Sequence, residues 1–593
     1  MNKKLEAIRT RMKAKGIDAL IIPITDPHLG EYVPDHWRIV RWLTGFTGSA
    51  ANVVITQNFA GLWTDSRYFI QAEEQLQGSG FVLMKLKIPH SPEYIDWMTD
   101  RLEDESNVGV DGRLMSIAIV RMIEKAFGRK KIKIDTDCDL ISATWKDRDP
   151  FPGEEAFDHP LKYAGISRKD KIAALRAQMK AMGADYHLLT ALDDIAWLLN
   201  IRGGDVKFSP LFTSFALISH ADLVLFAGVE KIPIDLRQKL ESEDISMMDY
   251  GSVSAELEKL EEGRSIIITP GTTSASLFRA IPGNVSIIEE ISIPTRMKAL
   301  KNGVEIENIR QVMIKDGLAL TRFFHWLENS LGRIKISEIS AAEKLLEFRM
   351  QQADCEGPSF ATIAAFNDHG ALPHYCPAPE TDTELKAGGI FLLDSGGQYY
   401  GGTTDVTRTV SLGKPTEQQK KDFTLALKGT INLAMAKFPL GTKGYQLEIL
   451  ARRALWEHGM NYGHGTGHGV GYFLNVHEGP QTIGTGAGGD QKTIIEPGML
   501  ISDEPAIYRE GEYGFRTENL LLCVEDRKTE FGIFLKFDTV TLCYIDTSLI
   551  APELMTASET GWLNDYHDLV YSILSQLLPE EIKAWLNEST KAI

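Results

Sequence analysis

The chain has 593 residues, of which 43% are apolar and 24% charged, so it is long enough for two to four folded domains. Its net charge of −18 argues against nucleic-acid binding, because such proteins present a basic face. No uncharged run reaches the length of a membrane span, and the first residues mix charges where a signal peptide is apolar. We therefore expect a cytoplasmic protein that binds neither nucleic acid nor membrane.

The five cysteines support the same compartment. They are scattered, odd in number and without C-x-x-C spacing. This pattern is typical of reduced thiols and not of a disulfide framework or a zinc finger.

The first half of the chain contains one pattern twice. Residues 3–15 predict an amphipathic helix that ends at Gly16, and an apolar strand is expected at 19–23. The motif [I/L]-R-x-x-M-K-A-x-G-x-D occurs at 8–18 and again at 175–185. A proline-rich stretch near residue 150 separates the copies and is typical of a linker. We predict two related α/β domains, at residues 1–155 and 156–296.

Residues 297–593 predict a different, α+β domain. Helices are expected from apolar periodicity or capping motifs at 306–327, 338–350, 416 onward, 444–459 and 559–593. Strands are expected at 390–394, 403–410, 499–502 and 515–524, the second of them half-buried. Two helices followed by strands occur twice, which predicts a pseudo-symmetric domain with carboxylates from each half. In the last strand, alternation would place Arg516 and Glu518 on one face.

Four acidic residues and one histidine lie in this region at the ends of predicted strands or in a glycine-rich loop. Any one of them could lie on the surface or cap a helix, but their combination is harder to explain that way. The set is Asp394, Asp405, His468, Glu504 and Glu518. Buried carboxylates need partners, and two divalent ions would balance four of them. The residues thus predict two ions roughly 3.5–4 Å apart with a bridging hydroxide, and hence hydrolysis. The oxygen-rich set suits manganese, cobalt, zinc or iron.

The motifs around these residues resemble those of the pita-bread metallopeptidases, and within them the long, three-domain, cytosolic X-Pro aminopeptidases. The resemblance covers essentially the whole chain. It is carried by L-D-S-G-G-Q-Y (393–399), G-T-T-D-V-T-R-T (402–409), H-G-T-G-H-G-V-G (464–471), N-V-H-E-G-P (475–480), S-D-E-P (502–505) and, outside the site, W-T-D-S-R-Y-F (63–69). The resemblance implies two creatinase-N-like α/β domains before a pita-bread catalytic domain, two manganese ions and a homodimer. It also implies peptide substrates with proline at the second position.

The resemblance also implies roles for single residues. The five residues of the set would hold the ions, and Glu504 would also accept a proton from the bridging water. His374 and His477 would assist catalysis and contact the substrate. The further substrate-binding residues implied are Arg67, His464 and Arg516.

Two other functions compete with this interpretation. One is a prolidase, which cleaves only X-Pro dipeptides. The duplicated N-terminal module and the length of the chain favour the aminopeptidase. The other is a catalytically inactive pita-bread module that binds peptides or histones. Such modules typically lack the ligands, whereas all five are present here.

Overall fold

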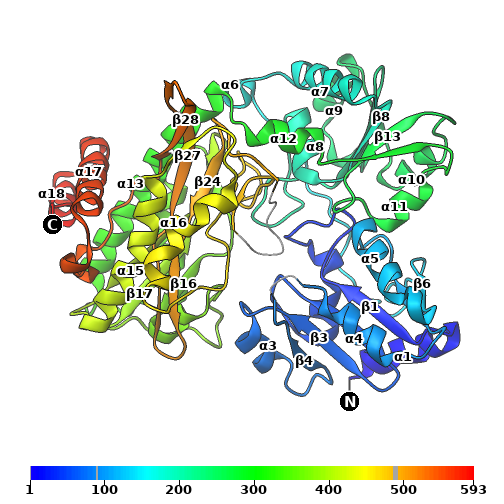
Figure 1. Cartoon of the computed structure of the whole chain (residues 1–593), viewed down its shortest axis with the longest axis horizontal. Coiled ribbons are helices and arrows are strands. Elements are labelled where there is room, and N and C mark those ends of the chain that lie inside the picture. The colour runs from blue at the N-terminus through cyan, green and yellow to red at the C-terminus, as the bar shows by residue number, and fades with distance from the viewer. Residues whose placement is uncertain (1, 89–90, 485–491) are drawn as a thin grey trace. The chain divides into compact units, whose positions relative to one another are not determined.

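The computed structural model describes residues 2–88, 91–484 and 492–593, which fold into two compact units (Figure 1). Unit 1 comprises Met1–Leu161 and Ile166–Thr295, and unit 2 comprises Lys162–Gly165 and Arg296–Ile593. Within the described residues, no helix combines the length and the apolar character of a membrane span.

Unit 1 contains two six-stranded sheets with the same strand order. The first is β4-β3-β2-β1-β5-β6 and the second β12-β11-β10-β8-β13-β14. The helices α1 (Lys3–Lys15) and α7 (Arg168–Met182) end at Gly16 and Gly183, whose φ values of 66° and 71° favour glycine. The predicted duplication is confirmed. The strands of the first sheet are β1 (Ala19–Pro23), β2 (Asn52–Thr56), β3 (Ala60–Thr64), β4 (Val82–Lys85), β5 (Asn107–Val110) and β6 (Lys133–Asp135). Those of the second are β8 (Tyr186–Leu189), β10 (Ser214–Ser219), β11 (Leu223–Ala227), β12 (Ile245–Met248), β13 (Ser265–Ile268) and β14 (Ser286–Glu289).

The two modules of unit 1 share a core. The start of α5 (Ile117–Phe127) meets the second module, where Ile117 N donates to Thr273 O and Ala275 N donates to Met115 O. One apolar cluster contains buried residues of both modules, such as Val108 and Ile266. The other helices of the unit are α2 (Ile39–Thr44), α3 (Phe69–Gln75), α4 (Glu93–Arg101), α8 (Leu192–Leu199), α9 (Ile234–Ser242), α10 (Val253–Leu257) and α11 (Ala275–Ala280). The boundaries expected at residues 155 and 296 stay predictions.

The first half of unit 2 begins with two long helices. These are α13 (Gly303–Ser330) and α14 (Glu338–Met350), the second with the predicted bounds. The strands after them form two three-stranded sheets, β16-β17-β20 and β15-β18-β19. Their bounds are β15 (Cys355–Pro358), β16 (Ile363–Phe366), β17 (Ile390–Ser395), β18 (Gly397–Tyr399), β19 (Gly402–Thr403) and β20 (Val406–Ser411). Each half of the unit thus places a helix pair before its strands.

The second half repeats the scheme with α15 (Glu417–Ala434) and α16 (Gly444–Trp456). Thr416 and Gln419 form the expected capping box at the start of α15. A four-stranded sheet, β21-β28-β27-β24, and two strand pairs follow. The bounds are β21 (Lys437–Pro439), β22 (Gly467–His468), β23 (Thr482–Ile483), β24 (Leu500–Asp503), β25 (Ala506–Arg509), β26 (Tyr513–Arg516), β27 (Asn519–Thr529) and β28 (Gly532–Thr539). The chain ends with α17 (Ala557–Leu574) and α18 (Glu580–Ser589), which lie beside α13 (Figure 1).

Two expected strands differ from the prediction. The segment 403–410 is not one half-buried strand, because β19 ends at Thr403 and β20 is buried on both faces. Its polar residues are hydrogen-bonded inside the domain, so polarity here does not mark solvent exposure. The segment 515–524 is broken at 517–518 between β26 and β27, so strand alternation does not place Arg516 and Glu518 together.

Candidate metal centre

The five predicted ligands come from the ends of separate strands of unit 2. Asp394 stands near the end of β17, and Asp405 lies between β19 and β20. His468 ends the short strand β22, Glu504 directly follows β24, and Glu518 directly precedes β27. The chain thus brings together residues that are up to 124 positions apart in the sequence. Strand ends let each side chain leave the sheet toward a common point.

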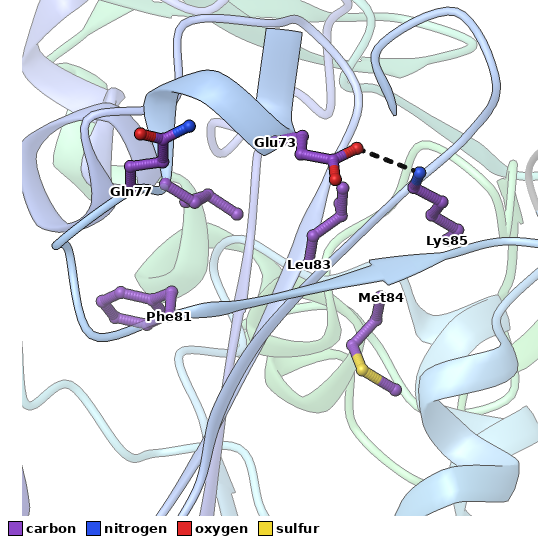
Figure 2. Close-up of a pocket in the computed structure, with 7 residues that line it drawn as sticks. Glu73, Gln77, Phe81, Leu83, Met84 and Lys85 are labelled. Atoms are coloured by element: carbon purple, nitrogen blue, oxygen red, sulfur yellow. Dashed lines mark hydrogen bonds and ion pairs between the residues drawn. The ribbon is translucent and has the colours of Figure 1, made fainter. Parts of the chain in front are cut away.

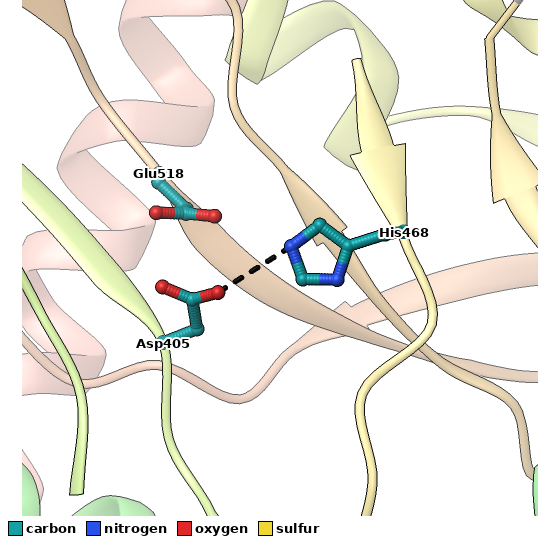
Figure 3. Close-up of side chains that lie close together, drawn as sticks. All are labelled: Asp405, His468 and Glu518. Carbon is teal, nitrogen blue, oxygen red and sulfur yellow. Dashed lines mark ion pairs between the residues drawn. The ribbon is translucent and has the colours of Figure 1, made fainter. Parts of the chain in front are cut away.

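Three of these residues form a compact cluster (Figure 3). Asp405, His468 and Glu518 each offer one ligand atom, and these atoms lie within 4.8 Å of one another. His468 Nε2 lies 3.4 Å from Asp405 Oδ2 and 3.9 Å from Glu504 Oε1, which brings Glu504 to the same centre. The expected convergence of these four residues is therefore present.

Asp394 joins the group through a buried arginine. Arg516 Nη2 donates to Asp394 Oδ2 at 2.6 Å, and Arg516 Nε donates to Thr407 Oγ1 at 3.1 Å. Thr407 Oγ1 in turn donates to Glu518 Oε2 at 2.8 Å. Arg516 and Glu518 thus meet at Thr407, although they do not share a strand. Arg516 supports two of the predicted ligands.

The histidines have defined tautomers. His468 Nδ1 lies 2.9 Å from Gly469 O. Because a carbonyl oxygen only accepts, the proton lies on Nδ1, and Nε2 turns its lone pair toward Asp405. A divalent ion between these two acceptors would bind both. His464 Nδ1 likewise donates to Gly465 O, so its Nε2 accepts from Tyr508 OH at 2.9 Å.

The electrostatics of the site also call for cations. Burial raises the pKa of Glu504 to about 7, with the charges of Asp405 and Asp394 acting in the same direction. Burial and the same two charges raise the pKa of Glu518, and burial raises that of Asp394. Asp394 Oδ1 is buried and accepts no hydrogen bond within the described part of the chain. Unpaired oxygens and mutually repelling carboxylates fit a pair of bound divalent ions.

Of the other predicted site residues, His477 contacts a predicted ligand, His374 lies on a loop of unit 2, and Arg67 lies in unit 1. The exposed ring of His477 packs edge-on against His468, with centroids 4.3 Å apart. His374 is half-buried on the loop between β16 and β17. Arg67 lies in unit 1, where it forms a two-pronged ion pair with the buried Asp65 at 2.8 Å. Its expected contact with substrate stays a prediction.

Two site residues were not predicted from the sequence. Tyr508 links Arg516 Nη1 (2.6 Å) to His464, and Thr407 links Arg516 to Glu518. A tyrosine four residues after Glu504 and a threonine two residues after Asp405 carry no strong signal, because hydroxyl groups are common in any strand. Their spacing from the ligands could have drawn attention to them.

A pocket of about 450 Å³ lies in unit 1, and none of the predicted site residues is among its described lining. Figure 2 shows Glu73 and Lys85 paired beside it at 3.1 Å. Its described lining is Glu73, Leu76, Gln77, Phe81, Leu83, Met84 and Lys85. This mixed lining from α3 and the edge strand β4 offers no cluster of nucleophilic or metal-binding groups.

Comparison with known proteins agrees with this geometry. Residues 307–525 match metallopeptidase family M24, and residues 533–593 match its C-terminal region. Residues 4–140 and 147–305 each match the creatinase/prolidase N-terminal domain. The second match along the chain contains α12 (Ile293–Ala299) and meets the third match in the first turn of α13.

Relatives match over nearly the full length. Xaa-Pro aminopeptidase ApepP of Drosophila melanogaster is 38% identical over 98% of this chain and 96% of its own length. A probable Xaa-Pro aminopeptidase P of Coprinopsis cinerea is 36% identical over 100% of this chain and 98% of its own. The solved X-prolyl aminopeptidase of Caenorhabditis elegans, described as a cytosolic enzyme with a di-nuclear active site, is 35% identical. It covers 100% of this chain and 99% of its own, with a TM-score of 0.94. The chain therefore belongs to the Xaa-Pro aminopeptidase P family, within metallopeptidase family M24.

Proposed function

We propose that this aminopeptidase hydrolyses the bond between the first residue of a peptide and a proline at the second position. The observation that carries the proposal is the convergence of Asp405, His468, Glu504 and Glu518 on one centre, with Asp394 tied to it by Arg516. These five residues would hold two divalent ions. Manganese is the metal we propose, with zinc and cobalt as alternatives for an oxygen-rich site that has one nitrogen ligand.

The ions, when bound, supply an activated water and an electrophile for the scissile carbonyl. Glu504 would accept the proton of the attacking water, and its side chain, 22% exposed, is open enough for a water to reach it. His374 and His477 would donate protons or hydrogen bonds to the carbonyl and to the leaving proline nitrogen. His464, oriented by Tyr508, would line the proline side of the site.

The chemistry of an X-Pro bond fits this arrangement. A proline nitrogen carries no N–H, so a protease that binds that N–H fails on such a bond. Attack on the carbonyl needs no such contact. The free α-amino group of the substrate would lie near the carboxylates of Asp394 and Asp405, which restricts cleavage to the terminal residue. Arg67 would contact the substrate, and Arg516 would support both the ligands and the substrate pocket.

Further properties are proposed from the relatives and the sequence. The cytosolic location named for the C. elegans enzyme fits the five free cysteines of this chain. We propose a homodimer and domain boundaries near residues 155 and 296. The catalytic chemistry would reside in residues 297–593 alone.

A panel of X-Pro-Y tripeptides with X-Ala-Y controls tests the activity. The protein is expected to release the first residue from Arg-Pro-Pro in the presence of manganese, and to leave X-Ala-Y peptides essentially intact. Loss of activity with EDTA and its return with manganese would support the metal requirement. Cleavage of X-Pro dipeptides without cleavage of Arg-Pro-Pro would instead identify a prolidase. No hydrolysis of either would identify a binding module.

A further inference from the structure

We propose that Glu338 is a positioning residue for the loop that carries His374, an inference that rests on the proposed function. Glu338 is the first residue of α14, and its side chain is fully buried. It lies 36 positions before His374 in the sequence and is not among the predicted ligands. The hydrogen bonds that this buried carboxylate accepts indicate its role.

Each oxygen of Glu338 accepts two hydrogen bonds, one of the four from the last residue of β16 and the other three from the loop that follows it. Oε1 accepts from Phe366 N at 2.7 Å and from His369 Nδ1 at 2.8 Å. Oε2 accepts from Tyr375 OH at 2.8 Å and from Thr383 N at 3.1 Å. Two of these donors precede His374 and two follow it. One carboxylate therefore fixes both sides of the loop.

The same loop is held against the strand that carries Asp394. The ring of Tyr375 stacks on His369, with centroids 4.3 Å apart, and packs with Ile363 and Leu392 of β16 and β17. Ile363 is paired with Asp394 in the register of these strands. Glu338 thus sets the position of His374 relative to a predicted ligand.

The loop also contacts the hairpin of β25 and β26. At Gly514, an added Cβ would lie 1.8 Å from Gly370 O, so the two backbones meet without room for a side chain. This hairpin carries Tyr508 and ends at Arg516. The loop therefore contacts both the β16–β17 pair and the β25–β26 hairpin, and its hydrogen bonds to Glu338 fix it in that position.

A carboxylate suits this position better than any neutral side chain. It stands at the N-terminus of a helix, where the helix dipole stabilises a negative charge. Four donors use all four of its acceptor positions, so it has no lone pair left for a metal ion or a substrate. Glutamine would offer a single oxygen and would confront the Thr383 N–H with its own N–H group. Glu338 acts through the loop and not on the reacting atoms.

A double-mutant cycle tests the proposal. We would measure kcat and KM on a manganese-loaded X-Pro-Y assay for wild type, Glu338→Ala, His374→Ala and the double variant. Glu338→Ala is expected to lower kcat by about tenfold or more, up to the 10²–10⁴-fold loss of a missing general acid–base group, with two ions still bound. In the His374→Ala background the same change is expected to alter kcat less than about twofold, since groups that act together are not additive.

A matched control is Glu559→Ala. Glu559 is also a buried carboxylate near the start of a helix, and it accepts from Lys428 Nζ, Asn432 Nδ2 and Thr556 N. Its loss should lower the free energy of unfolding and leave kcat unchanged. An equal effect of Glu338→Ala in both backgrounds, or a kcat equal to that of Glu559→Ala, would overturn the proposal.

Two milder variants keep the test decisive if alanine prevents folding. Glu338→Asp keeps all four acceptor positions and should recover more kcat than Glu338→Gln, although both preserve polarity. The reverse order would count against a positioning role. If wild type itself does not cleave X-Pro-Y, the proposed function fails, whereas an active wild type with additive variants refutes only the role of Glu338.

Discussion

Replacing Glu504 with glutamine is expected to leave the fold and the bound ions in place and to lower kcat by about 10²–10⁴-fold. Glutamine has nearly the same shape and keeps one oxygen for an ion, but it cannot accept the proton of the attacking water. Its backbone N–H donates to Thr466 O at 2.8 Å and is untouched by the change. Steady-state kinetics on an X-Pro-Y peptide, with metal analysis of the same sample, measures the effect.

Glu512 offers the control for this experiment. It lies exposed in the turn between β25 and β26, eight positions beyond Glu504, and Glu512→Gln makes the same chemical change. The control should show wild-type kcat. Near wild-type turnover by Glu504→Gln with two ions bound would contradict the assigned role.

Replacing Asp405 with asparagine is expected to abolish activity and yet to stabilise the metal-free protein. Burial raises the pKa of Asp394, Glu504 and Glu518, and the charge of Asp405 acts in the same direction on each, so the Asp405 charge is repelled by its neighbours when no ion is present. Removing that charge should raise the free energy of unfolding of chelated protein by about 0.5–2 kcal/mol, the usual gain at a destabilised functional site. Urea denaturation in EDTA measures this gain, and metal analysis should find fewer than two ions per chain.

Asp422→Asn serves as the opposite control. Asp422 is buried too, but it accepts from Arg509 Nη2 at 2.9 Å and from Tyr513 OH at 3.0 Å. Removing the Asp422 charge breaks its ion pair with the partly exposed Arg509 and weakens the hydrogen bonds to a buried carboxylate, so this variant should be less stable than wild type. If Asp405→Asn also lowers the stability of the chelated protein, the result contradicts a net repulsion between Asp405 and the neighbouring carboxylates.

The predicted ligands could be found in the sequence because each interrupts a pattern. Asp394 follows four apolar residues of a buried strand, and a charge there has to be compensated. His468 lies in a glycine-rich loop, and its combination with the carboxylates makes it a candidate ligand. The duplicated module was equally visible, since the repeated motif contains the glycine that caps the helix, Gly16 in one copy and Gly183 in the other.

What the sequence could not predict depends on contacts between distant segments. Thr407 belongs to a segment whose alternation predicts a half-buried strand, and only the structure places it between Arg516 and Glu518. The break at 517–518 lies in the polar stretch Arg516–Asn519, just before the apolar run that starts at Leu520, and no glycine or proline marks it. In the sequence, Glu338 looks like a glutamate that only stabilises the first turn of a helix. Its four hydrogen-bond donors lie 28 to 45 positions further along the chain, so the sequence pattern does not reveal them.

The most direct test is to count ions and turnover together. Protein freed of metal by chelation would be titrated with manganese, while bound metal and hydrolysis of an X-Pro-Y peptide are followed in the same samples. Turnover is expected to be absent in the chelated protein and to reach its maximum at two ions per chain. Full turnover with no ion bound, or binding of two ions without any X-Pro hydrolysis, would contradict a di-nuclear aminopeptidase site.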